Sequence, residues 1–295
     1  MDWLDSVAEQ WQRILKPNGS LYCFASPKMS ARVEVKLAER FNVLNNIRWI
    51  KEAGWHHKAK KEDARQYQNP WESIIFCEHY GADNIAKGEA GYQAKCDELR
   101  GFIFEPLRDY LDGERKRGNI DKCEINRALG FSPTPGGMAS RHYFSRSQFW
   151  IPTLEHYTKL QQSFPGYFTR PYELLRAEYE LLRRPFSVSA DVPYTDVWTF
   201  PTVQAYKGKH PCEKPAAMLE HIITASSRPG AVVLDCFAGS GSTLVAAKKL
   251  GRDFIGIEID PHWIEVCKAK LEDNPPPQVR TKKPEPLTEG QLSLF

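Results

Sequence analysis

The sequence predicts an α/β fold of the doubly wound, Rossmann-like type, and the evidence for it lies near the C-terminus. Residues 232–235 form an apolar run typical of a buried parallel strand, and the small residues after it predict a tight turn. Residues 243–250 have the apolar spacing of a helix that leaves this turn. A second apolar strand ends at Glu258, about 20 residues beyond the turn. Strand, turn, helix and strand together indicate one βαβ unit.

The turn and the acid at the end of the second strand indicate a site for a nucleotide-type cofactor. Bare backbone N–H groups at a helix N-terminus face the ligand, and the acid can accept hydrogen bonds from both ribose hydroxyls. The Gly-x-Gly-x-x-Gly fingerprint of dinucleotide-binding proteins requires a third glycine at the position that Leu244 occupies here. A nicotinamide-dependent oxidoreductase is therefore only an alternative interpretation. The residues assigned to this site are Asp235, Phe237, Ala238, Gly239, Ser240, Gly241, Ser242, Thr243 and Glu258.

The βαβ unit comes last in the chain, so the other strands of its sheet must precede it. A doubly wound sheet needs about five or more strands, whereas one predicted helix at 262–271 and a polar tail follow the unit. The elements predicted before it are a helix at 3–15, a strand at 20–25, a helix at 29–41, strands at 43–51 and 72–79, and a helix at 216–227.

Composition describes an ordinary soluble chain without deciding its partner. The 295 residues are 41% hydrophobic, enough for a sizeable core, and the net charge of +3 is too small to prove a nucleic-acid partner. The seven cysteines are dispersed without a Cys-x-x-Cys pair, so we expect no metal site and reduced thiols in the cytoplasm. No signal peptide or membrane-spanning run is present in the sequence.

Several segments outside the βαβ unit carry a resemblance to a known family. Residues 13–22 (RILKPNGSLY), 47–51 (IRWIK), 71–75 (WESII) and 210–215 (HPCEKP) resemble motifs of the DNA amino-methyltransferases, which modify adenine N6 or cytosine N4. The Phe-x-Gly-x-Gly turn after Asp235 likewise resembles their S-adenosylmethionine loop. The order of the motifs is similar to that of the circularly permuted beta class. The resemblance implies an enzyme that binds S-adenosylmethionine, with His210 and Lys214 beside the carboxylate side of the cofactor.

The resemblance departs from the family at the catalytic motif. Family members carry Asp/Asn/Ser-Pro-Pro-Tyr/Phe on a strand just upstream of the helix that begins here near Met1. The nearest match in this chain is 191–194 (DVPY), which makes Asp191 and Tyr194 weak catalytic candidates. We therefore expect the 295-residue chain to transfer methyl groups poorly or not at all. Of the two acceptors that the resemblance implies, we expect adenine N6, with cytosine N4 as its alternative, although no residue of the sequence distinguishes them. A cofactor- and DNA-binding remnant without activity is the second reading.

Residues 85–195 are predicted to form a helical, helix–turn–helix-like insertion that recognises double-stranded DNA. Helices are expected at 96–111, 120–129, 138–144 and 154–160, with a supporting wing within 145–157. A plain helical bundle with aromatic core residues is the alternative. The residues assigned to DNA contact are Ser140, Arg141 and His142 in the second helix of the motif, and Lys58, Lys60 and Lys61 in a basic loop at 54–70.

The last 22 residues differ in composition from the rest of the chain, and they form the last of four predicted parts. Residues 274–286 are rich in proline and predict an extended linker, and the chain ends in Gln-Leu-Ser-Leu-Phe. This ending resembles the peptides that dock bacterial replication and repair proteins on the sliding clamp, which assigns Gln291, Leu292, Leu294 and Phe295 to partner binding. The predicted parts are 1–84 (first half of the core), 85–195 (insertion), 196–273 (cofactor half) and 274–295 (tail).

Overall fold

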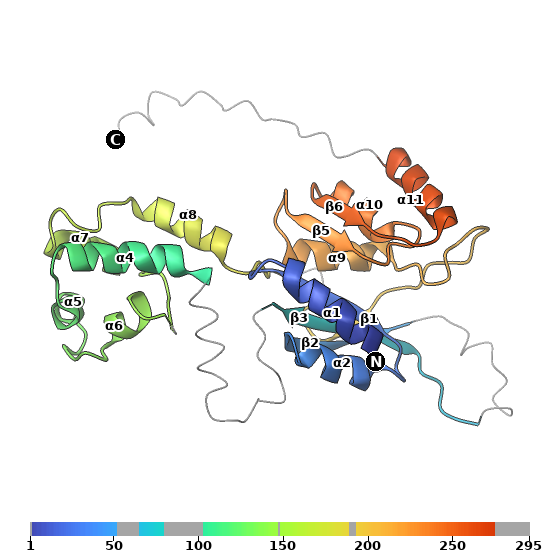
Figure 1. Ribbon diagram of the computed structural model, residues 1–295, viewed down its shortest axis with the longest axis horizontal. Coiled ribbons are helices and arrows are strands. Elements are labelled where there is room, and N and C mark those ends of the chain that lie inside the picture. The colour runs from blue at the N-terminus through green and yellow to red at the C-terminus, as the bar shows by residue number, and fades with distance from the viewer. Residues whose placement is uncertain (1, 52–64, 80–102, 147, 189–192, 275–295) are drawn as a thin grey trace. The chain divides into compact units, whose positions relative to one another are not determined.

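The computed structural model describes residues 2–51, 65–79, 103–146, 148–188 and 193–274. The described residues cluster into two compact units. The first comprises Met1–Thr202 with Ala225–Ser227, and the second comprises Val203–Thr224 with Arg228–Phe295. Figure 1 shows their helices and strands, and each unit is described by itself.

The first unit opens with a four-stranded mixed sheet. Its strands are β1 (Ser20–Ala25), β2 (Asn42–Ile50), β3 (Trp71–Glu78) and β4 (Val197–Thr199), in the order β1-β3-β2-β4. Strand β3 runs antiparallel to both of its neighbours, with Cys23 opposite Ile75 and Ile47 opposite Ile74, whereas β4 pairs with β2 in parallel. Because β3 is reversed relative to both neighbours, β1 and β2 point the same way.

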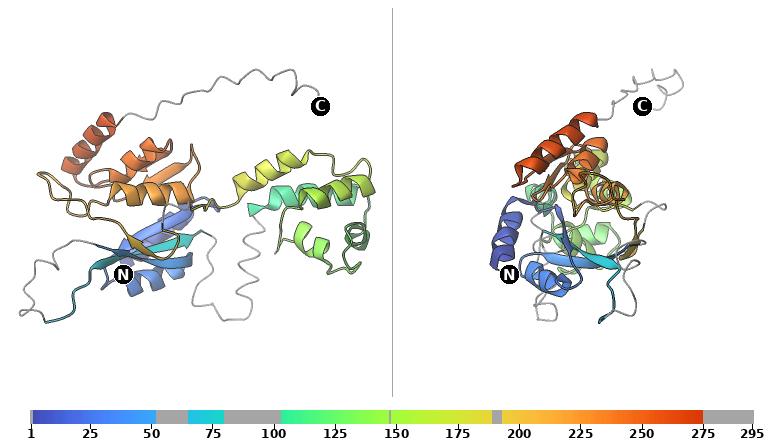
Figure 2. Two further views of the ribbon diagram at one scale, coloured as in Figure 1. Left: turned by 180° about the vertical axis from the view of Figure 1, so that it is seen from behind. Right: turned by 90° about the vertical axis from the view of Figure 1, so that its right-hand side faces the viewer.

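Two helices cover this sheet on the face where its core lies. Helix α1 (Asp2–Ile14) packs on α2 (Ser30–Ala38), which lies along β2 and β3 (Figure 2). Leu4 and Ala8 are the buried residues of α1, four positions apart and therefore on one face of the helix. They join a core that also contains Val33, Leu37, Ala38, Phe41, Val43, Ile75 and Cys77.

Between β3 and β4 the described elements are helices with a core of their own. They are α4 (Glu105–Arg117), α5 (Lys122–Ala128), α6 (Met138–Tyr143), α7 (Leu154–Ser163) and α8 (Tyr172–Leu182). Tyr157 is fully buried among them, and its hydroxyl lies 2.8 Å from the carbonyl oxygen of Phe168 and 3.0 Å from the hydroxyl of Tyr110. A capping box between Asp121 and Glu124 starts α5 and satisfies N–H groups that the first turn leaves unpaired.

The second unit contains the βαβ arrangement expected for the cofactor half. Helix α9 (Ala216–Ser226) precedes β5 (Val232–Asp235), α10 (Ser242–Lys249), β6 (Asp253–Gly256) and α11 (Pro261–Asp273). Strands β5 and β6 pair in parallel, with Val232 opposite Asp253 and Asp235 opposite Gly256. Val233 and Phe254 on one face of the pair pack against buried residues of α9 and α10. The predicted strand–turn–helix–strand order is confirmed.

Several sequence-based boundaries need correction. The pairing is a finding of the structure: β3 runs antiparallel to both of its neighbours, and the described strands form one four-stranded and one two-stranded sheet. The helix predicted at 96–111 begins at Glu105 within the described residues, and 96–102 lie outside them. Residues 145–153, apart from the undescribed 147, contain no strand, so the predicted wing is absent from the described part. Helix α8 was not predicted.

Within the described ranges, no helix is both long and apolar enough to cross a membrane.

Candidate functional site

The turn between β5 and α10 is shaped by glycines in the left-handed backbone region. Gly239 has a φ of 52° and Gly241 a φ of 80°, conformations that cost a residue with a Cβ about 1–2 kcal/mol. The N–H of Gly241 closes the turn on the carbonyl oxygen of Ala238 at 2.8 Å. A Cβ at Gly241 would also collide with the Sγ of Cys267 in α11. Backbone angle and close helix approach therefore both require glycine at this position.

Asp235 at the end of β5 holds the start of the same turn. Its Oδ1 accepts a hydrogen bond from the N–H of Phe237 at 3.0 Å, and its carbonyl oxygen accepts one from Ile257 at 2.9 Å. The Phe237 side chain is 57% exposed, whereas Ala238 and Ser240 are buried. Ser242 and Thr243 begin α10, whose N-cap residue Gly241 offers no side-chain capping bond, so the N–H groups of this first turn are not covered by a cap.

Glu258 ties the loop after β6 to the glycine turn. Its Oε2 accepts a hydrogen bond from the N–H of Gly239 at 2.8 Å, and its Oε1 accepts bonds from the N–H groups of Ile259 at 2.9 Å and Asp260 at 3.0 Å. The N–H of Asp260, with those of Gly239 and Ile259, holds the pKa of Glu258 below its usual 4.5. The lowered pKa keeps this carboxylate ionised. Because an ionised carboxylate has about four acceptor sites, Glu258 retains capacity for a ribose hydroxyl.

His210 and Lys214 come from a segment that is distant in sequence but belongs to the same unit. The His210 ring lies edge-on to Trp263 of α11 with ring centroids 4.5 Å apart, and its Nδ1 accepts a bond from the N–H of Cys212 at 3.2 Å. A Cβ at Gly239 would come within 3.1 Å of the His210 ring, so the imidazole packs directly on the turn. Lys214, four residues further along, is half-buried.

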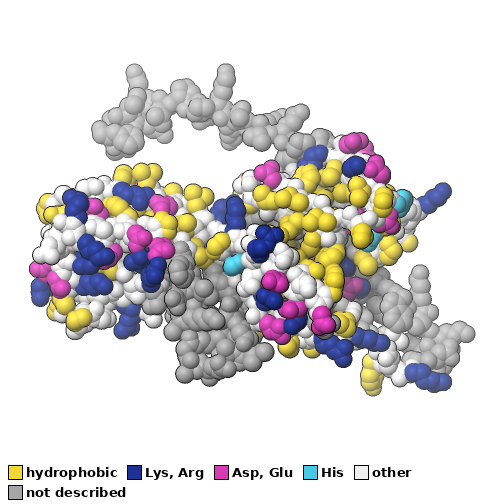
Figure 3. Space-filling model, in the orientation of Figure 1, with side chains coloured by type: hydrophobic (Ala, Val, Ile, Leu, Met, Phe, Trp, Pro, Cys, Tyr) yellow, Lys and Arg dark blue, Asp and Glu magenta, His cyan; other side chains and the backbone are white. Residues whose placement is uncertain are grey.

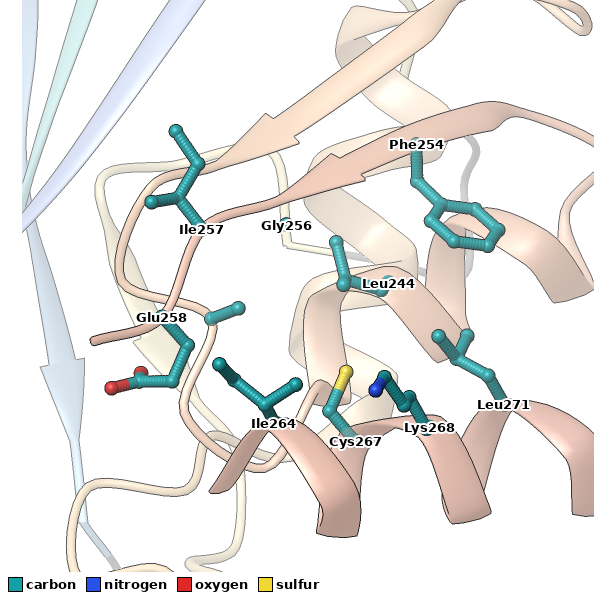
Figure 4. A pocket seen from close by; sticks show the side chains of 10 residues that line it. Leu244, Phe254, Gly256, Ile257, Glu258, Ile264, Cys267, Lys268 and Leu271 are labelled. Atoms are coloured by element: carbon teal, nitrogen blue, oxygen red, sulfur yellow. The ribbon is translucent and has the colours of Figure 1, made fainter. Parts of the chain in front are cut away.

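A cavity of about 430 Å³ lies beside this turn, between β6, α10 and α11. In Figure 4 the Glu258 carboxylate lies at one end and Phe254 and Leu271 at the other, with Ile264 and Cys267 projecting from α11. The volume falls within the range of small-ligand sites, and the mostly apolar lining with one anionic group suits an aromatic base with its sugar hydroxyls directed to Glu258.

The helix–strand packing explains why the third glycine of a dinucleotide fingerprint is absent. Leu244 in α10 is buried, and a Cβ at Gly256 in β6 would collide with its side chain. In this chain the strand supplies the small residue and the helix the large one, the reverse of the arrangement in which a helix glycine permits close packing on the strand. The nicotinamide alternative is accordingly unsupported.

The residues of α6 that were predicted to contact DNA differ in their exposure to solvent. Arg141 is exposed, whereas Ser140 is only 5% exposed and its Oγ accepts a hydrogen bond from Nδ2 of Asn126 at 2.8 Å. The structure thus places Ser140, one of the predicted DNA-contact residues, inside the helical core rather than on its exposed surface. His142 is half-buried, and its Nδ1 donates to the carbonyl oxygen of Gln148 at 3.1 Å.

Asn126 itself is the residue that joins the two helices of this motif. It is fully buried, its Oδ1 accepts the N–H of Ala139 at 2.9 Å, and its Nδ2 lies 2.9 Å from the carbonyl oxygen of Lys122. Gly137 approaches so closely that a Cβ there would lie 2.6 Å from the Asn126 side chain. Figure 3 shows Lys and Arg side chains spread over the visible face of the helical region, interspersed with acidic ones.

Some predicted site residues lie outside the described residues, and Tyr194 belongs to the first unit. Tyr194 is 81% exposed in the segment before β4. The residues outside the described ranges are Lys58, Lys60 and Lys61 of the basic loop, Asp191, and Gln291, Leu292, Leu294 and Phe295 of the tail. No group of His, Cys, Asp and Glu side chains with metal-binding geometry occurs among the residues that the structure describes.

Three polar or small residues of the described sites were not singled out by the sequence. They are Glu213, which contacts Ser240 of the turn, Asn126 at the α5–α6 junction, and Gly256 beneath Leu244. The Asp121-x-x-Glu124 capping pattern could have signalled the start of α5. No comparable local sequence pattern indicates the tertiary partners of Asn126 and Glu213, because those contacts join segments that are separated in sequence.

Comparison with known proteins identifies a family. The family model described as DNA methylase (N6_N4_Mtase) matches residues 1–269. The type II methyltransferase M2.MboI of Moraxella bovis is 31% identical over 147 residues, covering 49% of this chain and 48% of the relative. M2.DpnII of Streptococcus pneumoniae is 46% identical over 80 residues (26% of this chain, 30% of the relative).

A third relative and the solved structures complete the comparison. The DNA adenine methyltransferase YhdJ of Escherichia coli K12 is 46% identical over 80 residues, 26% of this chain and 27% of the relative. The alignments thus span less than half the length of each of these three curated relatives. Among solved structures, the M1.HpyAVI–SAM complex has a TM-score of 0.46 at 17% identity, with 91% of this chain and 82% of that chain covered. The cytosine-N4-specific PvuII DNA methyltransferase has a TM-score of 0.47 at 12% identity (92% and 70%).

Proposed function

This chain belongs to the DNA methylase family whose model covers residues 1–269, and on that premise we propose that it is an S-adenosylmethionine-dependent DNA methyltransferase. The acceptor is the exocyclic amine of a flipped base, adenine N6 in the first instance. The relatives named as type II and adenine methyltransferases support this acceptor and a role of the restriction–modification kind in a bacterium or phage. A DNA substrate in a bacterium supports a cytoplasmic location, which belongs to the same proposal.

The observation that carries the proposal is the junction of Glu258 with the glycine turn. The Glu258 carboxylate accepts hydrogen bonds from the N–H groups of Gly239, Ile259 and Asp260, and it still has capacity for a ribose hydroxyl. The uncapped first turn of α10 offers N–H groups to the methionine part of the cofactor, and Lys214 supplies the cation for its carboxylate. Bound S-adenosylmethionine supplies an electrophilic methyl group on a sulfonium centre.

Methylation of an exocyclic amine requires the protein to orient the amine rather than to activate it strongly. The lone pair of an exocyclic amine is delocalised into the base, so acceptors must take its hydrogens as the nitrogen attacks the methyl carbon. The residues that contact the amine would hold its hydrogens and accept the proton released on methylation, and bound S-adenosylmethionine would supply the methyl group. Asp191 and Tyr194 are the candidates for amine contact in this chain, with Tyr194 exposed.

The helical region is the proposed reader of double-stranded DNA. Arg141 projects from α6, which Asn126 fixes to α5, so its guanidinium is presented by a rigid junction. Replacing Arg141 by Ala should weaken binding to one preferred duplex by about 1–3 kcal/mol and random duplex far less. Arg176→Ala is the matched control, because this exposed arginine of α8 pairs with Glu180 at 2.5 Å. Equal losses on every duplex would identify a phosphate contact instead.

The proposed partner of the tail is the bacterial sliding clamp. Gln291, Leu292, Leu294 and Phe295 would enter its peptide groove, and the proline-rich linker would let the folded part act on nearby DNA. Truncation after Pro286 should abolish association with purified clamp and leave cofactor affinity unchanged. Equal association of the truncated and intact proteins contradicts this partner. The four-part layout of 1–84, 85–195, 196–273 and 274–295 belongs to the same proposal.

Titration calorimetry tests the cofactor and a labelled-methyl assay tests the reaction. The protein should bind S-adenosylmethionine in preference to NAD, and Glu258→Ala should weaken that binding by about 1.5–3 kcal/mol through lost charge-assisted hydrogen bonds. Transfer of labelled methyl to DNA, recovered as N6-methyladenine, supports the full activity. Binding without transfer supports the inactive remnant, and preferential binding of NAD contradicts the cofactor.

A further inference from the structure

Glu213 is a largely buried acid that the proposed mechanism does not use. Its side chain is 10% exposed, and in sequence it lies between His210 and Lys214, shortly before α9 begins at Ala216. An ionised carboxylate removed from water is destabilising unless hydrogen bonds and a counter-charge compensate it. The groups that provide this compensation come from three different segments of the second unit.

The contacts of Glu213 reach both the glycine turn and α11. Its Oε2 accepts hydrogen bonds from the hydroxyl of Tyr206 at 2.7 Å and from Oγ of Ser240 at 3.1 Å. Its Oε1 lies 3.3 Å from Nζ of Lys270, which also lies 3.3 Å from the Tyr206 hydroxyl. Burial raises the pKa of Glu213, but the bonds from Tyr206, Lys270 and Ser240 outweigh it and hold the pKa below its usual value.

The Ser240 contact matters because of where Ser240 lies. It is 3% exposed and stands between the two left-handed glycines of the turn, 27 residues from Glu213 in sequence. Glu258 binds the N–H of Gly239, the preceding residue, at 2.8 Å. Two carboxylates from separate segments therefore hold adjacent residues of one turn. The turn is fixed from both directions before any ligand binds.

The same contacts fix the segment that carries Lys214. His210 packs on Gly239 and Trp263, and Glu213 binds Ser240 and Lys270, so the segment is attached to the turn and to α11 at two points. Lys214 is the next residue after the second of these points. Its backbone position is consequently set by Glu213, which makes the location of the proposed carboxylate-binding cation depend on this acid.

We infer that Glu213 is a positioning residue of the cofactor site, which holds the glycine turn and Lys214 in the arrangement that binds S-adenosylmethionine. The inference rests on the proposed function for the identity of the ligand. The positioning itself is a property of the unliganded protein. It can therefore be measured without the cofactor, and the two claims can fail separately.

Hydrogen–deuterium exchange on the full chain tests the positioning. Glu213→Ala should speed exchange about tenfold in peptides covering 236–244, since a bond worth about 1.4 kcal/mol corresponds to a tenfold change in opening. Glu213→Gln should recover most of the protection, because its carbonyl oxygen can still accept from Ser240 and Tyr206. Glu220→Ala is the matched control, since Glu220 pairs with Lys249 at 2.9 Å elsewhere in the unit. The control should leave exchange at 236–244 unchanged.

Cofactor titration of the same variants tests the consequence. Glu213→Ala should weaken S-adenosylmethionine binding about tenfold, Glu213→Gln less, and Glu220→Ala not at all. Unchanged exchange at 236–244 in Glu213→Ala, or an increase equal to that in distant peptides, overturns the inference. A wild-type protein that binds no S-adenosylmethionine but shows the exchange pattern overturns the proposed function and leaves the positioning role standing.

Discussion

The glycine turn of the cofactor half and the α5–α6 junction of the helical region are held by polar side chains that are used in opposite ways. Both polar atoms of the Asn126 side chain form hydrogen bonds inside the helical core. Its Nδ2 donates to Ser140 and to nearby carbonyl groups, and its Oδ1 accepts from the N–H of Ala139. Glu258 and Glu213 are ionised, and Glu258 keeps acceptor capacity after binding three N–H groups. A structural junction satisfies its polar groups completely, whereas a ligand site holds its frame with charged groups that can still accept another bond.

The largest expected effect comes from removing the structural junction. Asn126→Ala should lower the free energy of unfolding of the helical region by about 3 kcal/mol, because it leaves buried groups at Ala139 and Ser140 without partners. Denaturant unfolding followed by circular dichroism measures this loss. Affinity for S-adenosylmethionine should stay at the wild-type value. A fall in that affinity would contradict the expectation that the α5–α6 junction stabilises the helical region without affecting cofactor binding.

A pair of neighbouring glycines sharpens the same test. Gly137→Ala should be destabilising because its Cβ would lie 2.6 Å from the Asn126 side chain, whereas a Cβ at Gly136 meets nothing within 4 Å. Gly136→Ala is therefore the control that carries the same change in composition. Equal unfolding free energies for the two variants would mean that the helices can separate slightly at no cost.

An effect of comparable size is expected at the cofactor turn. Gly241→Ala should cost about 3 kcal/mol, since its φ of 80° is unfavourable with a Cβ and the Sγ of Cys267 occupies the space. Gly251→Ala has a φ of 68° but open space around it, so it should cost about 1 kcal/mol. The difference, measured by thermal unfolding, isolates the contact between turn and α11. No difference between the variants would show that Cys267 moves aside freely.

The two regions also differ in how well their sequences predict them. Periodicity and turn residues located the strand at Ser20–Ala25 and the whole βαβ order of the second unit, because those signals are local. The direction of β3 left no trace in its apolar run, since a buried strand has the same composition whichever way it runs. The pairing in the folded sheet, from Ser20 opposite Glu78 to Ala25 opposite Ser73, reveals that it is antiparallel.

Site residues followed the same division between local and distant signals. The turn from Asp235 to Thr243 and Glu258 were identifiable because the glycine spacing and the acid form a short pattern. Ser140 was assigned to the DNA face because sequence places it beside Arg141, but its helix turns it toward Asn126. Glu213 was missed since its partners Ser240 and Lys270 lie 27 and 57 residues away and come together only in the folded unit.

The smallest expected effect distinguishes the charge of Glu258 from its shape. Its folded-state pKa is lowered below the usual 4.5, chiefly by the N–H of Asp260, so its contribution to stability is fully present above pH 4.5 and is lost as the pH falls through the lowered value. Glu258→Gln should therefore melt a few degrees below wild type at pH 7, and the gap should close at more acidic pH. Thermal melting of both proteins between pH 3 and pH 7 measures this convergence, with Glu265→Gln as control because Glu265 pairs with Lys268 on the exposed face of α11. A gap that stays constant across this range would mean that Glu258 holds the turn through its geometry alone, as the uncharged amide of Asn126 does in the helical region.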